Sequence, residues 1–134
     1  MKLKAADYVV LIVADLEASV HFYTGVLNLP LHHLAPNGKF AELDTGVTHI
    51  SLYTRDAMSE TLGREISAPH RDQPGFELAF KVDDVDAAFA EVVAAGFEAA
   101  VQPTTKFWGQ RTAYIYDPDG HLIEFAQDLP QDDS

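Results

Sequence analysis

The sequence repeats itself at an interval of about half its length. The hexapeptide Val-Ala-Asp-Leu-Glu-Ala at residues 13–18 returns as Val-Asp-Asp-Val-Asp-Ala at residues 82–87 of a 134-residue chain. A repeated unit that is too small to bury its own apolar face packs against its copy. The chain is therefore predicted to be a duplicated small fold, with a ligand site between the copies or inside the curved sheets that they form.

Each copy contains the same succession of predicted elements, β-α-β-β-β. In the first module, residues 7–54, an apolar β-branched run at 8–13 predicts a buried strand, and Asp15 is a suitable N-cap for the following helix. The apolar face of that helix is predicted at Leu16, Val20, Tyr23 and Leu27. Turn residues then separate three short strands, expected at 30–34, 39–44 and 48–54.

The second module, residues 75–127, repeats this order. Its strands are predicted at 76–82, 97–101, 111–117 and 122–127. Its helix begins after Asp83 or Asp84 and carries an apolar face of Val85, Phe89 and Val92. Between the modules, residues 55–74 are predicted to be a connector with one helical turn near 58–62. A connector of this length is either a plain linker or the edge of a binding site.

The composition is that of one acidic globular domain, residues 1–134. With 47% apolar residues, the chain is long enough to bury one sizeable core. Nine basic and 21 acidic residues give a net charge of −12, so no nucleic-acid or membrane partner is expected. The absence of cysteine excludes disulfides, zinc-thiolate centres and thiol nucleophiles. No long apolar stretch indicates a signal peptide or membrane span, and we expect a cytoplasmic protein.

Several motifs resemble those of the vicinal oxygen chelate superfamily, which includes glyoxalase I, extradiol dioxygenases and the bleomycin-resistance proteins. The motifs are V-x-D-[LV]-[DE]-A after the first strand of each module, F-Y-x-x-V-L-x-L in the first helix and D-P-D-G-x-x-I-E-F near the end. The resemblance extends over residues 7–125. It implies an α+β fold of two tandem βαβββ modules whose curved sheets surround a concave cup. It also implies that the ligand site lies on the face opposite the helices.

Alternation along the strands sorts residues between the helix-facing side and this cup. The residues predicted to bind a ligand are Tyr8, Phe40, His49, Ser51, Tyr53, Glu77, Tyr114, Tyr116 and Glu124, with Trp108 at the rim. Aromatic walls suit a flat, partly apolar ligand, because ring faces supply stacking and tyrosine hydroxyls supply directed hydrogen bonds. The inward carboxylates of Glu42, Glu77 and Glu124 would favour a cationic or hydrogen-bond-donating ligand. Aromatic core packing without any ligand is the alternative.

The resemblance also implies where a metal would be held. Metal-dependent members place His or Gln on the first strand, Glu on the fourth, His on the fifth and Glu on the eighth. These positions correspond here to Tyr8, Ser51 (or His49 in a shifted register), Glu77 and Glu124. Tyrosine and serine are poor ligands beside imidazole and carboxylate, so no metal and no other cofactor is predicted. One divalent metal at a site rebuilt from Glu77, Glu124 and His49 is the alternative.

Without a cation, Glu77 and Glu124 would share the cup as two carboxyl groups. Desolvation and mutual repulsion would then raise the pKa of at least one of them. Pairing with Lys81, Lys106 or Arg111 is the competing expectation. His49 is either a general base, a ligand contact or a strand residue hydrogen-bonded to a neighbour. No catalytic residue is assigned from the sequence.

The run Phe107-Trp108-Gly109-Gln110-Arg111 followed by Asp117-Pro118-Asp119-Gly120 is similar to the drug-binding resistance branch of this superfamily. Members of that branch lack the metal and bind the drug as dimers. We therefore predict a homodimer that binds a small planar or amphipathic molecule without a metal, as in antibiotic resistance by sequestration. A metal-dependent lyase, isomerase or dioxygenase is the alternative, and a ligand-free interaction domain with a filled cup is a third.

Overall fold

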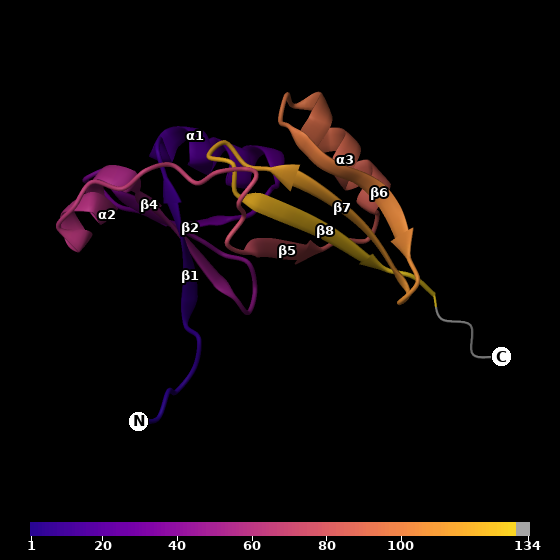
Figure 1. Ribbon diagram of the computed structural model, residues 1–134, viewed down its shortest axis with the longest axis horizontal. Coiled ribbons are helices and arrows are strands. Elements are labelled where there is room, and N and C mark those ends of the chain that lie inside the picture. The colour runs from indigo at the N-terminus through magenta and orange to yellow at the C-terminus, as the bar shows by residue number, and fades with distance from the viewer. Residues whose placement is uncertain (131–134) are drawn as a thin grey trace. The chain divides into compact units, whose positions relative to one another are not determined.

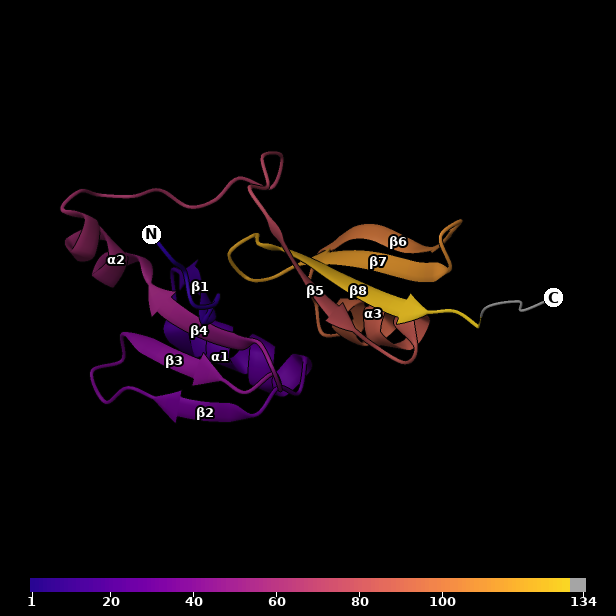
Figure 2. The same ribbon diagram turned by 90° about the horizontal axis from the view of Figure 1, so that it is seen from below.

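A computed structural model describes residues 1–130 of the chain, so the last four residues of the predicted 1–134 domain lie outside the described part. The chain divides into two compact units, Met1–Ala68 and Pro69–Ser134. Each unit contains one four-stranded mixed sheet with a helix against one face (Figures 1 and 2). The predicted α+β class and the βαβββ order of each module are confirmed.

The first unit is built around a sheet with the strand order β1-β4-β3-β2. Its elements are β1 (Tyr8–Val13), α1 (Leu16–Val20), the π-helix η1 (His21–Val26), β2 (Leu31–Leu34), β3 (Phe40–Leu43), β4 (His49–Thr54) and α2 (Arg55–Leu62). β1 runs parallel to β4, whereas β3 is antiparallel to both β4 and β2. The strands begin and end within one or two residues of their predicted positions.

The helix of the first unit differs from the prediction in its second half. The Asp15 carboxylate caps α1 by accepting a hydrogen bond from the Ala18 amide at 3.1 Å, as expected. Beyond Val20 the chain widens into η1, in which the Leu27 amide donates to the Phe22 carbonyl at 3.0 Å. A π-helical turn holds an extra residue, so it changes which side chains share a face. The buried residues are Leu16, Ser19, Phe22 and Tyr23, whereas the predicted Val20 and Leu27 are only half-buried.

The second unit repeats the sheet with the strand order β5-β8-β7-β6. Its elements are β5 (Glu77–Lys81), α3 (Val85–Ala94), β6 (Ala99–Lys106), β7 (Gln110–Tyr116) and β8 (Leu122–Asp128). The Asp84 carboxylate caps α3 through the Ala87 amide at 3.1 Å. β6 extends five residues beyond its predicted end at 101, with register shifts between Ala99 and Thr104. Pro103 lies in that strand and lacks an amide proton, so an irregular, outermost strand accommodates it.

Burial along the strands alternates as the sequence predicted. Side chains that face the helices form the cores, and they are Leu11, Val13, Ala41, Leu43, Ile50 and Leu52 in the first unit and Ala113, Ile115, Ile123 and Phe125 in the second. The alternate residues of the same strands are therefore left on the opposite face of each sheet. This opposite face carries the candidate sites.

The predicted connector is partly helical. Instead of one turn near 58–62, α2 occupies Arg55–Leu62 directly after β4. The Thr54 hydroxyl caps it by accepting from the Ala57 amide at 3.3 Å, and Gly63 ends it with a φ of 71°. Residues after a capping hydroxyl and before a left-handed glycine are well placed for a short helix. The first part of the connector thus belongs to the first unit.

Candidate functional sites

The first unit contains a cavity of about 440 Å³ on the sheet face opposite α1. Its lining residues are Tyr8, Val10, Phe40, Glu42, Ser51, Tyr53, Met58 and Thr61. Four of the predicted ligand-binding residues, Tyr8, Phe40, Ser51 and Tyr53, therefore share one hollow. Aromatic and aliphatic walls with a few convergent polar groups are typical of small-molecule sites.

Strand register explains why these side chains converge. Phe40 of β3 lies directly opposite Tyr53 of β4, and Glu42 lies opposite Ser51 two pairs further along, which is the next pair on the same face. Directly opposite residues have Cβ atoms about 5 Å apart and point to the same face. β1 extends the arrangement, because Val10 is the partner of Ser51 on its other side. The floor of the cavity is thus a continuous patch over β1, β4 and β3.

Helix α2 supplies one wall of this cavity. Met58 and Thr61 lie one turn apart on the helix and both line the hollow. The hydroxyls of Tyr53 and Thr61 lie 3.3 Å apart, within hydrogen-bonding distance, and the Thr61 hydroxyl also donates to the Ala57 carbonyl at 3.0 Å. The Tyr53 ring is consequently tied to α2. Sequence reasoning missed Met58 and Thr61 because it assigned their segment to the connector.

His33 is a further residue that the sequence analysis did not select. It is the cross-strand partner of Glu42, and its ring centroid lies 5.6 Å from that of Phe40. His33 therefore lies on the same sheet face as the cavity residues, whereas its neighbour His32 points to the other face. The register of β2 against β3 places His33 on this face. That register contains a shift between Leu31 and His33 that the sequence alone did not reveal.

The second unit brings three other predicted residues together. Tyr114 of β7 lies directly opposite Glu124 of β8, and Glu77 of β5 lies near Glu124 on the same face. Burial, followed by a hydrogen bond with Glu77 and the charge of Glu77, raises the pKa of Glu124 above its usual value. A hydrogen bond between two carboxyl groups requires a proton on one of them. The direction agrees with the rise expected for two carboxyl groups that share the cup, while the charge of Lys106, one of the residues expected to pair with them, acts in the opposite sense.

The phenol of Tyr114 responds to the same carboxyl groups. Burial and the negative charges of Glu124 and Glu77 raise its pKa, so it is a neutral hydrogen-bond donor at physiological pH. Two of the basic residues that were candidates for pairing have other partners: Lys81 pairs with Asp128 at 2.8 Å and Arg111 with Asp86 at 2.7 Å. Lys106 alone of the three acts on Glu124, through its charge.

The remaining predicted site residues are neither among the cavity-lining residues nor among the groups that shift the pKa of Glu124. Trp108 is 53% exposed in the turn between β6 and β7, where its indole nitrogen donates to Gln110 at 2.9 Å. Tyr116 has the Arg71 guanidinium 5.3 Å from its ring centroid. His49 is exposed at the first residue of β4, opposite Tyr8, and is not among the cavity-lining residues.

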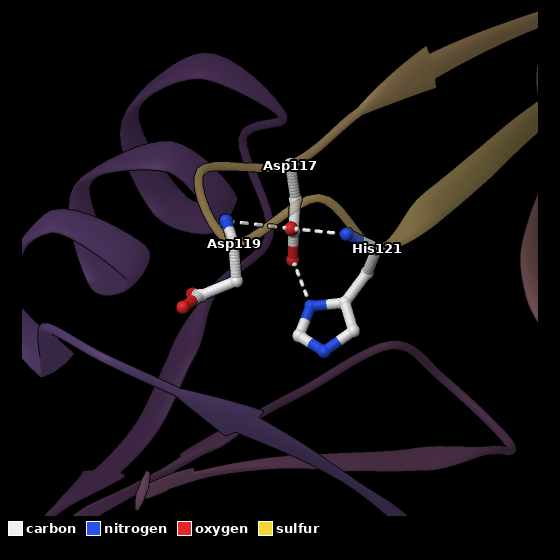
Figure 3. A group of neighbouring side chains, drawn as sticks. All are labelled: Asp117, Asp119 and His121. Atoms are coloured by element: carbon white, nitrogen blue, oxygen red, sulfur yellow. Dashed lines mark hydrogen bonds and ion pairs between the residues drawn. The ribbon is translucent and has the colours of Figure 1, made fainter. Parts of the chain in front are cut away.

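One group of potential metal ligands occurs where β7 turns into β8. Asp117, Asp119 and His121 place ligand atoms within 4.8 Å of one another (Figure 3). The Asp117 side chain is fully buried and accepts hydrogen bonds from the backbone amides of Asp119 and His121, at 2.9 and 2.8 Å, and from His121 Nδ1 at 2.7 Å. Both of its oxygens already accept hydrogen bonds that close the turn. These hydrogen bonds explain, without a bound ion, why the three side chains lie close together.

The positions at which metal-dependent members hold their ion fit Zn²⁺ or Ni²⁺ poorly. Tyr8 and Ser51 belong to the first unit, where they contribute a phenol and a hydroxyl to the cavity. In the second unit Glu77, Glu124 and Tyr114 supply oxygen donors and no imidazole. Oxygen donors of this kind suit hard cations such as Mg²⁺ and Mn²⁺ better than Zn²⁺ or Ni²⁺.

A second hollow, of about 690 Å³, lies on the helix side of the first unit. It is lined by Asp15, Leu16, Glu17, Val20, Leu34, Ala35, Pro36 and Gly38. Although it is larger, its lining contains no aromatic ring, and one of its two carboxylates caps α1. The smaller cavity, with its aromatic rings and hydroxyl groups, is therefore the better candidate for a ligand site.

The fold and the cup-face residues define a known class of protein. The family model of the Glyoxalase/Bleomycin resistance protein/Dioxygenase superfamily matches residues 5–125, and the chain belongs to this superfamily. None of the helices in the described part of the chain is long and apolar enough to span a membrane.

Individual relatives agree with this assignment. The protein YraH of Bacillus subtilis (strain 168), described as uncharacterized, is 37% identical over 121 residues, which are 89% of this chain and 94% of YraH. The crystal structure of a glyoxalase/bleomycin resistance protein/dioxygenase from Nocardioides is 25% identical, with a TM-score of 0.77 over 98% of this chain and 88% of that chain. A lactoylglutathione lyase from Agrobacterium tumefaciens, 21% identical with a TM-score of 0.70 over 95% and 96% of the two chains, shares the fold.

Proposed function

We propose that the protein binds a small planar or amphipathic molecule in the cavity of the first unit, without a metal. The observation that carries this proposal is the convergence of Tyr8, Phe40 and Tyr53 with the hydroxyl groups of Ser51 and Thr61 around one hollow of about 440 Å³. Ring faces would stack on a flat ligand while the hydroxyl groups orient its polar atoms. Sequestration of a planar antibiotic is one use of such a site.

The test compares two substitutions of the same kind. Phe40→Ala removes a ring from the cavity wall, whereas Phe107→Ala removes a ring that is 96% exposed in a turn of the second unit. Equilibrium dialysis against a panel of planar antibiotics, in the presence of EDTA, should give saturable binding. We expect Phe40→Ala to weaken the binding about fivefold or more, because a ring–ring contact contributes about 1 kcal/mol beyond its buried area. Absence of saturable binding across the panel, or equal losses in both variants, would contradict the proposal.

The resemblance to drug-binding members that work as dimers extends the proposal to a cytoplasmic homodimer. The chain has a mass of 14.7 kDa, so sedimentation equilibrium should give twice that value at micromolar concentration. A mass equal to that of the single chain, unchanged by the bound ligand, would remove the dimer from the proposal and leave the cavity in place.

One observation favours a second candidate, a metal-dependent lyase, isomerase or dioxygenase. Glu77 and Glu124 interact on one face of the second sheet, and a divalent cation would neutralise the repulsion between their carboxylates. Titration with Mn²⁺, followed by the relaxation of water protons, distinguishes the candidates. Stoichiometric binding that Glu124→Ala abolishes would favour the enzyme, and its absence at millimolar Mn²⁺ would favour the metal-free binder.

A further inference from the structure

The cavity of the first unit has one formal charge among its lining residues. That charge is the carboxylate of Glu42, which lies on the central part of the floor, half-buried between His33 of β2 and Ser51 of β4. The other lining residues are aromatic, aliphatic or hydroxyl-bearing. A ligand that enters the cavity therefore meets a single negative charge in an apolar and aromatic setting.

Glu42 has no cationic side chain to neutralise it within the part of the chain that the structure describes. No Lys or Arg over residues 1–130 forms an ion pair with it. Lys39, which precedes β3, pairs instead with Glu60 of α2 at 3.6 Å. A half-buried carboxylate without a counter-ion attracts any cation that fits beside it, because a nearby opposite charge stabilises the ionised form.

The aromatic rings of the cavity add attraction of the same sign. Phe40 and Tyr53 are directly opposite each other on β3 and β4, and they form the pair next to Glu42 on this face of the sheet. Tyr8 completes the aromatic lining. The quadrupole of an aromatic ring gives its faces a negative electrostatic potential. Ammonium groups within about 6 Å of the ring centroid are attracted to it by about 0.5–2 kcal/mol. Carboxylate and ring faces together thus select for positive charge on an otherwise apolar ligand.

The net charge of the whole chain acts in the same direction. At −12 the protein attracts cations and repels anions at long range, so a cationic ligand is also favoured during its approach. Given the proposed function, on which this inference rests, we infer that the ligand of the first-unit cavity is an organic cation. Its protonated or quaternary amine would lie against Glu42 while its planar body packs on Phe40 and Tyr53.

The experiment uses two probes of the same shape and different charge. Naphthylmethylamine is an ammonium ion at neutral pH, and naphthylmethanol replaces the ammonium by a neutral hydroxyl. Calorimetric titration of the full chain should show the amine binding at least tenfold more tightly than the alcohol. Raising the salt concentration should weaken the binding of the amine and leave the binding of the alcohol unchanged, because salt screens only the attraction between charges.

Two substitutions locate the effect. Glu42→Gln keeps the shape of the side chain and removes its charge. It should therefore reduce the preference for the amine several-fold, leaving the part that the aromatic rings and the net charge supply, without weakening the binding of the alcohol. Glu65→Gln, at an exposed residue beyond α2 that does not line the cavity, should leave the preference unchanged. The two salt titrations on the unaltered chain still test the inference if the Glu42 variant fails to fold.

The outcomes separate the inference from the proposed function. Saturable binding of both probes with equal affinity, or a preference for the amine that is undiminished in Glu42→Gln, would overturn the organic cation and leave the binding function standing. Failure of both probes to bind would overturn the inference and count against the proposed function itself. A tenfold preference that Glu42→Gln reduces several-fold supports both.

Discussion

At the scale of single residues, the ionisation of Glu124 has a consequence for stability. Burial and Glu77 raise its pKa in the folded protein, so its protonated form is favoured by folding. The stabilisation that this proton provides is fully present below the ordinary carboxyl pKa and is lost as the pH rises through the raised pKa of Glu124. Near neutral pH the ionised Glu124 therefore disfavours the folded state.

Glu124→Gln should remove this penalty. As the pH rises from about 4 to about 7, we expect the midpoint of thermal unfolding of the variant to rise relative to that of the unaltered protein. The matched control is Glu91→Gln, at an exposed residue of α3, whose difference from the unaltered protein should stay constant over this range. Parallel pH profiles of the unfolding midpoint for Glu124→Gln and the unaltered protein would show that protonation of Glu124 contributes nothing to stability.

Strand alternation and the family resemblance together predicted part of the candidate site. Alternation sorts Tyr8, Phe40, Ser51 and Tyr53 onto one face of the sheet, and the resemblance indicates that this face, opposite the helices, carries the ligand. The position of His33 on the cavity face depends on a register shift in β2, and the position of Met58 in the cavity wall depends on how α2 packs. Both features arise from contacts between elements distant in the chain, which local sequence patterns do not encode.

At the scale of elements, the strands were predictable and the helices less so. Turn residues separate most neighbouring strands, so the predicted boundaries deviate little from β1, β4 and β8, whereas β6 extends past its predicted end. The wide turn of η1 buries Phe22 and Tyr23 together, with their ring centroids 4.9 Å apart in an edge-to-face arrangement. That arrangement depends on the core that receives the rings, and a regular helical period did not predict it.

Helix α2 gives a prediction at this scale, because a single hydroxyl caps it and it forms a wall of the cavity. Thr54→Ala should lower the stability of α2 by about 1 kcal/mol, the usual effect of losing an N-cap. Hydrogen exchange should then accelerate several-fold at the amides of residues 58–62 and not in α3. Asp84→Ala, which removes the cap of α3, is the matched control and should show the reverse pattern. Unchanged exchange in α2 would mean that packing alone holds the helix.

At the scale of the whole molecule, duplication has produced two similar units with different polar chemistry. Both units have the same strand order and a capped helix against one face of the sheet. The first has acquired α2 and a cavity with aromatic walls, whereas the second has a carboxyl pair beside Tyr114. The repeat in the sequence predicted the shared architecture, since strand and helix patterns are local. The differences depend on single side chains and on the segment between the copies.

The central claim is that the first-unit cavity binds a planar ligand without a metal, and the two methionines of the chain allow a direct measurement. Met58 lines the cavity, and Met1 is fully exposed. NMR of protein labelled with ¹³C at the methionine methyl groups, titrated in EDTA with a ligand from the binding panel, should show a saturable ring-current shift at Met58 and none at Met1. A ligand that binds saturably while the Met58 signal stays in place would contradict the account.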